Sequence, residues 1–241
     1  MSTLEALAAD IHGALAGRDR TVILYGKRTP ASASLATAVV PRDPEGLGLD
    51  LSPDIGLRLA DELETQHVTY ELTVQADGQW DAVTCTDPGI GEDDDTVFWQ
   101  RRALPESLDV SGVPESNRVE VQGEHRVDVA ALVAGADVKV LRVRDVPEAT
   151  GLAALGALTD LRQIELPPHM LPTAAPYLRD LPRLAVIRFP RRTPLADVVR
   201  YASLLEEPGG ALEASLAITS GQVPGSAAAA PRKRRWFGFG R

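Results

Sequence analysis

The sequence predicts an α+β N-terminal domain, a short α/β repeat unit with a 23-residue period, and a disordered C-terminal tail. Apolar residues in the first hundred positions change between helical and strand spacing, and leucines recur every 23 residues in the second half. Gly, Pro, Ser and Ala dominate after residue 207. The expected parts are the α+β domain at 1–104, the repeat unit with a capping helix at 105–206, a flexible linker at 207–231 and a basic, aromatic tail at 232–241.

The composition is typical of a soluble globular chain. The 241 residues are 44% hydrophobic and 24% charged, with a net charge of -9. No apolar run approaches the ~18 residues of a membrane-spanning helix, and no N-terminal signal segment is visible. The single cysteine, Cys85, excludes a disulfide framework and a multi-cysteine zinc site. We therefore expect a cytoplasmic protein, and 22 arginines against 3 lysines are typical of a GC-rich bacterial genome.

The first hundred residues alternate between helix and strand patterns. A helix is expected over 2–17, where apolar residues recur at helical intervals, and Ser52-Pro53 opens a second helix. The period then changes to two, and Asp77-Gly78 supplies the tight turn of a β-hairpin. The expected strands are 21–25, 35–40, 68–74 and 80–86.

An acidic stretch at 87–95 follows the hairpin. It lacks the alternating ligands and closing glutamate of a calcium-binding EF-hand, so a solvated loop is the better interpretation. Trp99 is expected to pack back on the sheet, and prolines and a glycine between 105 and 114 mark a domain boundary near residue 105.

The strongest pattern is a repeat in the second half of the chain. Five apolar residues spaced LxxLxxLxxIxL recur 23 residues later, and a copy 23 residues earlier carries one glycine. Val119 and Val121 lie 22 residues before the last two positions of that earlier copy, so a fourth, irregular strand is expected to begin the stack. The copies are Leu132, Gly135, Val138, Leu141 and Val143; Leu155, Leu158, Leu161, Ile164 and Leu166; and Leu178, Leu181, Leu184, Ile187 and Phe189.

This spacing resembles that of leucine-rich repeat proteins over about residues 116–190, roughly a third of the chain. The resemblance implies a solenoid in which each turn contributes a short parallel strand and buries its leucines in a shared core. The family usually carries asparagine or cysteine after each strand, whereas this chain has Val146, His169 and Arg192. Nearby prolines, which lack N–H donors, are expected to reduce the need for that asparagine. A helix over 194–205 is expected to cap the last turn.

The strand register places one charged side chain per strand on the outer face of the repeat. These residues are Glu120, Arg142, Glu165 and Arg188, and the face also carries Arg144, Gln163, Val140 and Val186. The charges alternate in sign and neighbouring strands lie ~4.8 Å apart, so a cross-strand series of ion pairs is expected. Two interpretations stay open: the pairs keep an exposed face soluble, or the face binds a partner protein.

The last ten residues combine positive charge with aromatic side chains. They carry +5, which leaves -14 on the other 231 residues. Three uses compete: docking into a groove of another protein, reversible association with an anionic membrane, and folding back on the acidic body. Nucleic acid is an unfavoured partner, because the acidic body would repel its phosphates. The candidate contact residues are Arg234, Arg235, Trp236, Phe237 and Phe239.

Motifs for catalysis and cofactors find little support. Gly26-Lys27 lacks the earlier glycine of a phosphate-binding loop, since Thr21 stands there. The four histidines are far apart and none has metal-ligand spacing. We therefore expect no cofactor, no metal and no enzymatic activity.

The leading hypothesis is a non-catalytic adaptor or recruitment protein that binds another protein through the repeat face and the tail. An alternative is an immunity protein, because the N-terminal order of elements is similar in topology to small immunity proteins of bacterial toxin systems, whose acidic surfaces neutralise a cognate toxin. A second alternative is an uncharacterised hydrolase, which would need a pocket that gathers His, Asp and a nucleophile.

Overall fold

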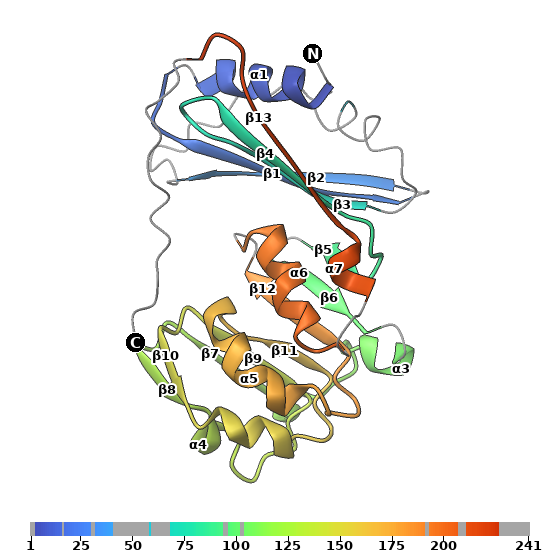
Figure 1. The fold of residues 1–241 in the computed structure, drawn as a ribbon. Coiled ribbons are helices and arrows are strands. Elements are labelled where there is room, and N and C mark those ends of the chain that lie inside the picture. Colours follow the sequence, from blue (N-terminus) through green and yellow to red (C-terminus); the bar gives the residue numbers. More distant parts are fainter. Residues whose placement is uncertain are drawn as a thin grey trace.

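The computed structural model describes residues 3–15, 17–29, 32–40, 58, 68–93, 96–101, 104–190, 193–206 and 211–226. They form a mixed α/β fold with several sheets (Figure 1). Two predictions lie outside the described residues: the helix that begins at residue 52, apart from Arg58, and the tail at 232–241 with its five candidate contact residues.

Five antiparallel strands form the first sheet, in the order β13-β4-β3-β1-β2. They are β1 (Thr21–Thr29), β2 (Ser32–Val40), β3 (Val68–Val74), β4 (Gln79–Cys85) and β13 (Leu216–Gln222). The pairing of β3 with β4 confirms the predicted hairpin. Helix α1 (Thr3–Leu15) covers one face, where its Leu7 and Ile11 share a buried cluster with Leu24 and Leu72 (Figure 1).

Six strands form the second sheet, in the order β5-β6-β12-β11-β9-β7. They are β5 (Ile90–Glu92), β6 (Thr96–Gln100), β7 (Arg118–Gln122), β9 (Val140–Arg144), β11 (Gln163–Glu165) and β12 (Val186–Pro190). Strands β7, β9, β11 and β12 run parallel. Leu141 of β9 lies opposite Val119 of β7 and Ile164 of β11. Ile164 also lies opposite Ile187 of β12. The four strands therefore pair in the register that the repeat spacing predicts.

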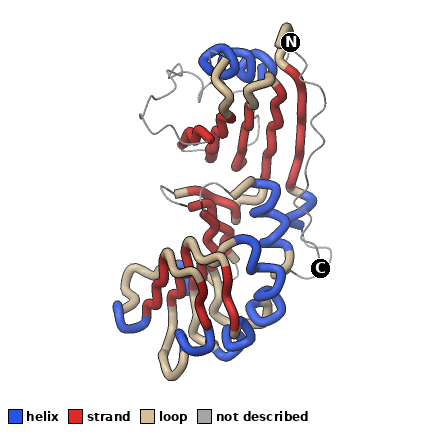
Figure 2. The backbone as a smooth tube through the Cα atoms, turned by 90° about the vertical axis from the view of Figure 1, so that its left-hand side faces the viewer, coloured by secondary structure: helices blue, strands red, loops and turns tan. Residues whose placement is uncertain are grey.

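Helical turns return the chain between the parallel strands and bury the repeated leucines. Leu155, Leu161, Leu178 and Leu184 are fully buried. The return segments include α4 (Val129–Val133), η2 (Leu152–Ala157), η3 (Pro168–Met170) and α5 (Leu171–Leu178), and α6 (Leu195–Ser203) follows β12 as the predicted helix (Figure 2). The remaining short elements are α3 (Pro105–Leu108), η1 (Glu115–Asn117), β8 (Arg126–Asp128), β10 (Glu148–Thr150) and α7 (Ala211–Ala214).

Two segments differ from the sequence prediction. Strands β5 and β6 precede the expected boundary at residue 105, yet they extend the second sheet by antiparallel pairing of β6 with β12. The expected linker at 207–231 is wrong for residues 211–222, which form α7 and β13. The physical reason is that strand pairing uses backbone groups, so an uncharged strand can join β4 without a regular apolar pattern.

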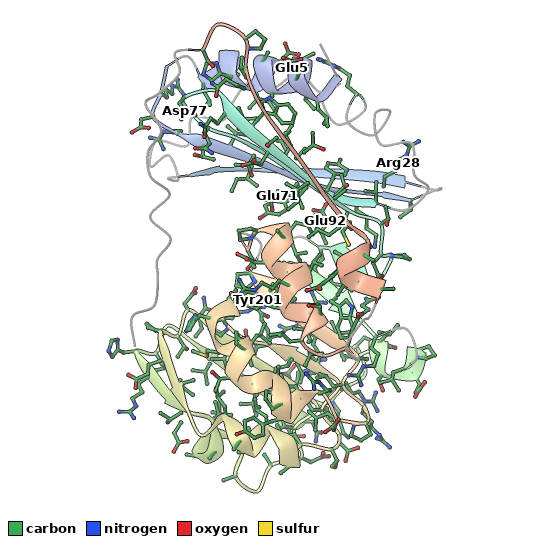
Figure 3. The ribbon with its side chains drawn as sticks, viewed as in Figure 1. Glu5, Arg28, Glu71, Asp77, Glu92 and Tyr201 are labelled. Atoms are coloured by element: carbon green, nitrogen blue, oxygen red, sulfur yellow. The ribbon has the colours of Figure 1, made fainter. Side chains whose placement is uncertain are left out.

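The two sheets share a core. Tyr25 and Cys85 of the first sheet belong to the same buried cluster as the repeated leucines. The Tyr25 hydroxyl donates to the carbonyl of Thr193 at 2.9 Å, and the Leu195 N–H donates to the Glu71 carboxylate at 2.7 Å. Figure 3 shows Glu71 on the face of the first sheet that turns toward α6. The sheets are thus joined by apolar packing and by buried hydrogen bonds.

Candidate functional site

An ion-pair network crosses the outer face of three parallel strands. Arg144 donates through Nε and Nη2 to the two carboxylate oxygens of Glu165, at 2.8 and 2.9 Å. Arg144 also approaches Glu120 at 3.4 Å, and Arg142 lies 3.9 Å from Glu120 and 4.0 Å from Glu165. The structure therefore brings together four of the predicted face residues, and the bidentate Arg144–Glu165 pair is their strongest contact.

Arg188 does not join this network. Its guanidinium contacts Asp93 and donates to the Thr96 hydroxyl at 2.8 Å, and it lies 5.6 Å from the centre of the Phe98 ring. The expected series of pairs is wrong at this residue because β6 pairs beside β12 and places Phe98 opposite Arg188. Partial burial acts to raise the pKa of Asp93, but hydrogen bonds from Arg188 and Thr96 outweigh it, and the pKa lies below its ordinary value.

The middle of this face is buried rather than exposed. Gln163 is 1% exposed and Glu165 is 2% exposed, and Val140 and Val186 are also buried. β11 is flanked by β9 and β12, which places Gln163 between Val140 and Val186, and Glu165 between the longer side chains of Arg142 and Arg188. The expectation that all of these residues face solvent is therefore wrong, and the accessible part of the face lies toward its edges.

Three buried donor atoms on this face have no hydrogen-bond acceptor among the described residues. They are Arg142 Nε, Gln163 Nε2 and Arg188 Nε. Buried polar groups in folded proteins are normally paired with protein or ordered water. Because these three atoms are also shielded from solvent, an incoming group does not reach them in this conformation, and an accessible donor of the face is Arg144, whose side chain is 27% exposed.

A pocket of about 640 Å³ opens at the carboxyl ends of β9, β11 and β12. Arg144 and Glu165 supply its charged wall, and four prolines and two valines supply apolar surface. Its lining residues are Thr96, Val143, Arg144, Asp145, Val146, Pro147, Glu165, Pro167, Pro168, His169 and Pro190. Carboxyl ends of parallel strands are common ligand positions because the turns that follow are free to vary.

The turns around the pocket carry Val146 and His169 after β9 and β11. Val146 is buried, and the exposed His169 has its Nε2 3.1 Å from the Pro147 carbonyl oxygen. Asp145 adopts a φ of 53°, which is uncommon outside glycine, and its carboxylate accepts a hydrogen bond from Gln122 at 3.2 Å. Val146 and His169 stood out in the sequence, but the pocket was not predicted. Usable signals were Pro147 after β9 and Pro167 and Pro168 after β11.

The pocket contains the residue types of a hydrolase without the contacts of a catalytic relay. The Thr96 hydroxyl donates to Asp93 at 2.8 Å, whereas His169 and Asp145 contact Pro147 and Gln122. A relay would need the hydroxyl, imidazole and carboxylate to be hydrogen-bonded in series. In the described part of the chain, no three His, Cys, Asp or Glu side chains gather as a metal site.

Comparisons with known proteins leave the family open. No protein-family model matches the chain, and neither the curated proteins nor the solved structures include a significant match. No helix in the described ranges is long and apolar enough to cross a membrane.

Proposed function

We propose that this protein is a non-catalytic adaptor that binds a segment of another protein at the outer face and pocket of its parallel strands. We also propose that residues 116–190 form a short leucine-rich repeat solenoid, which is supported by four parallel strands in repeat register over buried leucines. The observation that carries the function is a pocket of about 640 Å³ whose charged wall is the partly exposed Arg144, held in place by the buried Glu165.

The pocket's chemistry suits a peptide segment. Proline walls offer rigid apolar surface that loses little side-chain entropy when covered. Arg144 lines the pocket with a side chain that is 27% exposed, so it can donate to backbone carbonyl or carboxylate oxygens of the partner. Arg144 is held by Glu165, so its position is set before the partner arrives, which lowers the entropy lost on binding.

His169 allows a direct test of the pocket. Its side chain is exposed at the pocket, so His169→Trp fills the opening without entering the core. Ala136→Trp places the same indole on an exposed turn before β9, at the opposite end of the strands, and serves as the control. Proteins captured from native lysate by the immobilised full-length chain are compared quantitatively among the three forms.

We expect the amount of one captured protein to be at least tenfold lower with His169→Trp than with the wild type. The amount captured by Ala136→Trp should match that of the wild type. Equal recovery on all three forms would remove the pocket from the proposal. Circular dichroism and the melting temperature establish that each variant is folded before the comparison is made.

The basic, aromatic tail is the second contact in this proposal. Arg234, Arg235 and Trp236, with Phe237 and Phe239, combine positive charge with aromatic surface, a composition suited to docking in a partner's groove. Capture with a chain that ends at Pro231 tests this contact. Loss of one partner supports docking by the tail, and unchanged recovery argues against it.

A further inference from the structure

The outer edge of the first sheet is a candidate interaction surface. β13 is the terminal strand of the order β13-β4-β3-β1-β2, and it pairs with β4 along its whole length. Among the described residues no strand pairs with its other side. An unpaired strand edge presents backbone donors and acceptors that can extend the sheet into a second chain.

The register shows which backbone groups point outward. The Val223 N–H donates to the Gly78 carbonyl, and the Thr86 N–H donates to the Ser215 carbonyl. Since antiparallel pairs alternate, the odd-numbered residues of β13 direct their backbone groups toward β4. The N–H and C=O groups of Leu216, Ile218, Ser220 and Gln222 therefore point away from the sheet.

The side chains of β13 do nothing to block such pairing. The strand LAITSGQ has no charged residue and no proline, the features with which natural edge strands prevent association. Ile218 is 60% exposed, although isoleucine is among the residues most often buried. In a chain with a net charge of -9, this strand is a neutral stretch where two copies can approach without opposing like charges.

We propose that two copies of this protein pair through β13, antiparallel around a twofold axis. Pairing centred on Thr219 places Ile218 opposite the partner's Ser220, and Leu216 opposite the partner's Gln222. All outward backbone groups of the four residues then obtain partners, since the two edges are identical. The two Ile218 side chains become diagonal neighbours on one sheet face and are removed from water.

The first test uses the oligomeric state of the full chain, measured by sedimentation over a range of concentrations. Ser220→Pro removes an outward N–H and leaves the hydrogen bonds to β4 intact. Ile218→Lys adds charge at the proposed interface. Tyr177→Lys changes the other large apolar side chain that is exposed in the described residues, at 39%, and is the matched control.

We expect the wild type and Tyr177→Lys to form dimers, and the two β13 variants to dimerise at least tenfold more weakly. A monomeric wild type at all concentrations overturns the proposal. A dimer that persists unchanged in both β13 variants uses another surface and also overturns it.

Amide hydrogen exchange by NMR provides the second test. In a dimer, the amides of Ile218 and Ser220 gain protection as concentration rises, whereas those of Ala217 and Thr219 are protected throughout by β4. Protection of Ile218 and Ser220 at concentrations where sedimentation finds only monomer indicates that a segment of the same chain covers the edge, which contradicts pairing between copies. These readouts do not depend on partner binding at the pocket.

Discussion

The Glu71 carboxylate accepts a hydrogen bond at 2.7 Å from the backbone N–H of Leu195, a residue 124 positions later in the chain. Leu195 begins α6, whose first N–H groups have no acceptor within the helix. Glu71 of β3 thus caps the N-terminus of α6, which follows β12 of the second sheet. This contact helps to hold the two sheets in a fixed relative orientation.

Glu71→Ala is predicted to destabilise the protein by about 1–3 kcal/mol, because it leaves a buried N–H at the start of α6 without an acceptor. Urea unfolding measures the change. The exposed Glu106→Ala is the control and is expected to change stability by less than about 0.5 kcal/mol. Equal stability of both variants would show that the cap does not hold the sheets together.

The stability contribution of Glu71 is predicted to depend on pH. Burial raises the pKa of Glu71, and nearby Asp197 adds to the rise, while hydrogen bonds from Leu195, Tyr25 and Thr73 lower it less. The folded protein therefore binds this proton more tightly than the unfolded chain does. The contribution of Glu71 to the free energy of unfolding therefore increases as pH falls through the folded-state pKa toward the ordinary pKa of about 4.3.

Comparison with Glu71→Gln isolates that effect, because glutamine keeps an acceptor and does not titrate. As pH falls toward the ordinary glutamate pKa of about 4.3, we expect the free energy of unfolding of the wild type to rise relative to the variant. Asp93 has the opposite effect, because its pKa is lowered by folding. Its ionised carboxylate stabilises the protein at pH values above the ordinary aspartate pKa of about 3.9, and this contribution is lost as pH falls through the folded-state pKa. Parallel pH profiles for wild type and Glu71→Gln would contradict the prediction.

Arg144→Ala is predicted to destabilise the protein by about 3–5 kcal/mol, since it removes the bidentate partner of the buried Glu165 carboxylate. Arg126→Ala is the matched control, because its pair with Glu148 at 3.6 Å is exposed and contributes less than about 1 kcal/mol. Denaturant unfolding measures both. Replacing Arg144 and Glu165 together by methionine should restore part of the lost free energy of unfolding, because it also removes the buried Glu165 charge. If no stability is restored, the unpaired Glu165 charge is not the cause of the loss.

The repeat register could be predicted because it depends on local spacing. Leu141, Ile164 and Ile187 lie 23 residues apart in sequence and on adjacent strands of the sheet, so periodicity alone predicts their pairing. The pairing of β6 with β12 and of β13 with β4 joins segments far apart in sequence. No local pattern encodes such contacts, and their absence from the prediction led to the errors in the boundary and the linker.

The candidate site was predicted only in part for the same reason. Strand alternation predicted that Arg142 and Glu165 share a face, and they do. The burial of Glu165 and the diversion of Arg188 to Asp93 depend on neighbouring strands and on β6, whose position periodicity does not give. The pocket forms from turns, where packing rather than pattern sets the shape.

Gly26→Ala is predicted to destabilise the first sheet. Gly26 lies opposite Tyr70, and a methyl group at residue 26 would meet the Tyr70 ring at 2.1 Å. Tyr70 is 2% exposed, so the ring cannot move without disturbing the core beneath α1. Overpacking of this kind costs about 1–3 kcal/mol.

Gly13→Ala in α1 is the contrasting variant, because a methyl group there meets nothing within 4 Å. Alanine in a helix is favoured over glycine by up to about 1 kcal/mol, so this substitution should raise the melting temperature while Gly26→Ala lowers it. Thermal unfolding of the two single variants measures both signs under one condition. If both substitutions raise the melting temperature, Tyr70 does not pack against Gly26 as described, and the central pairing of β1 with β3 would need revision.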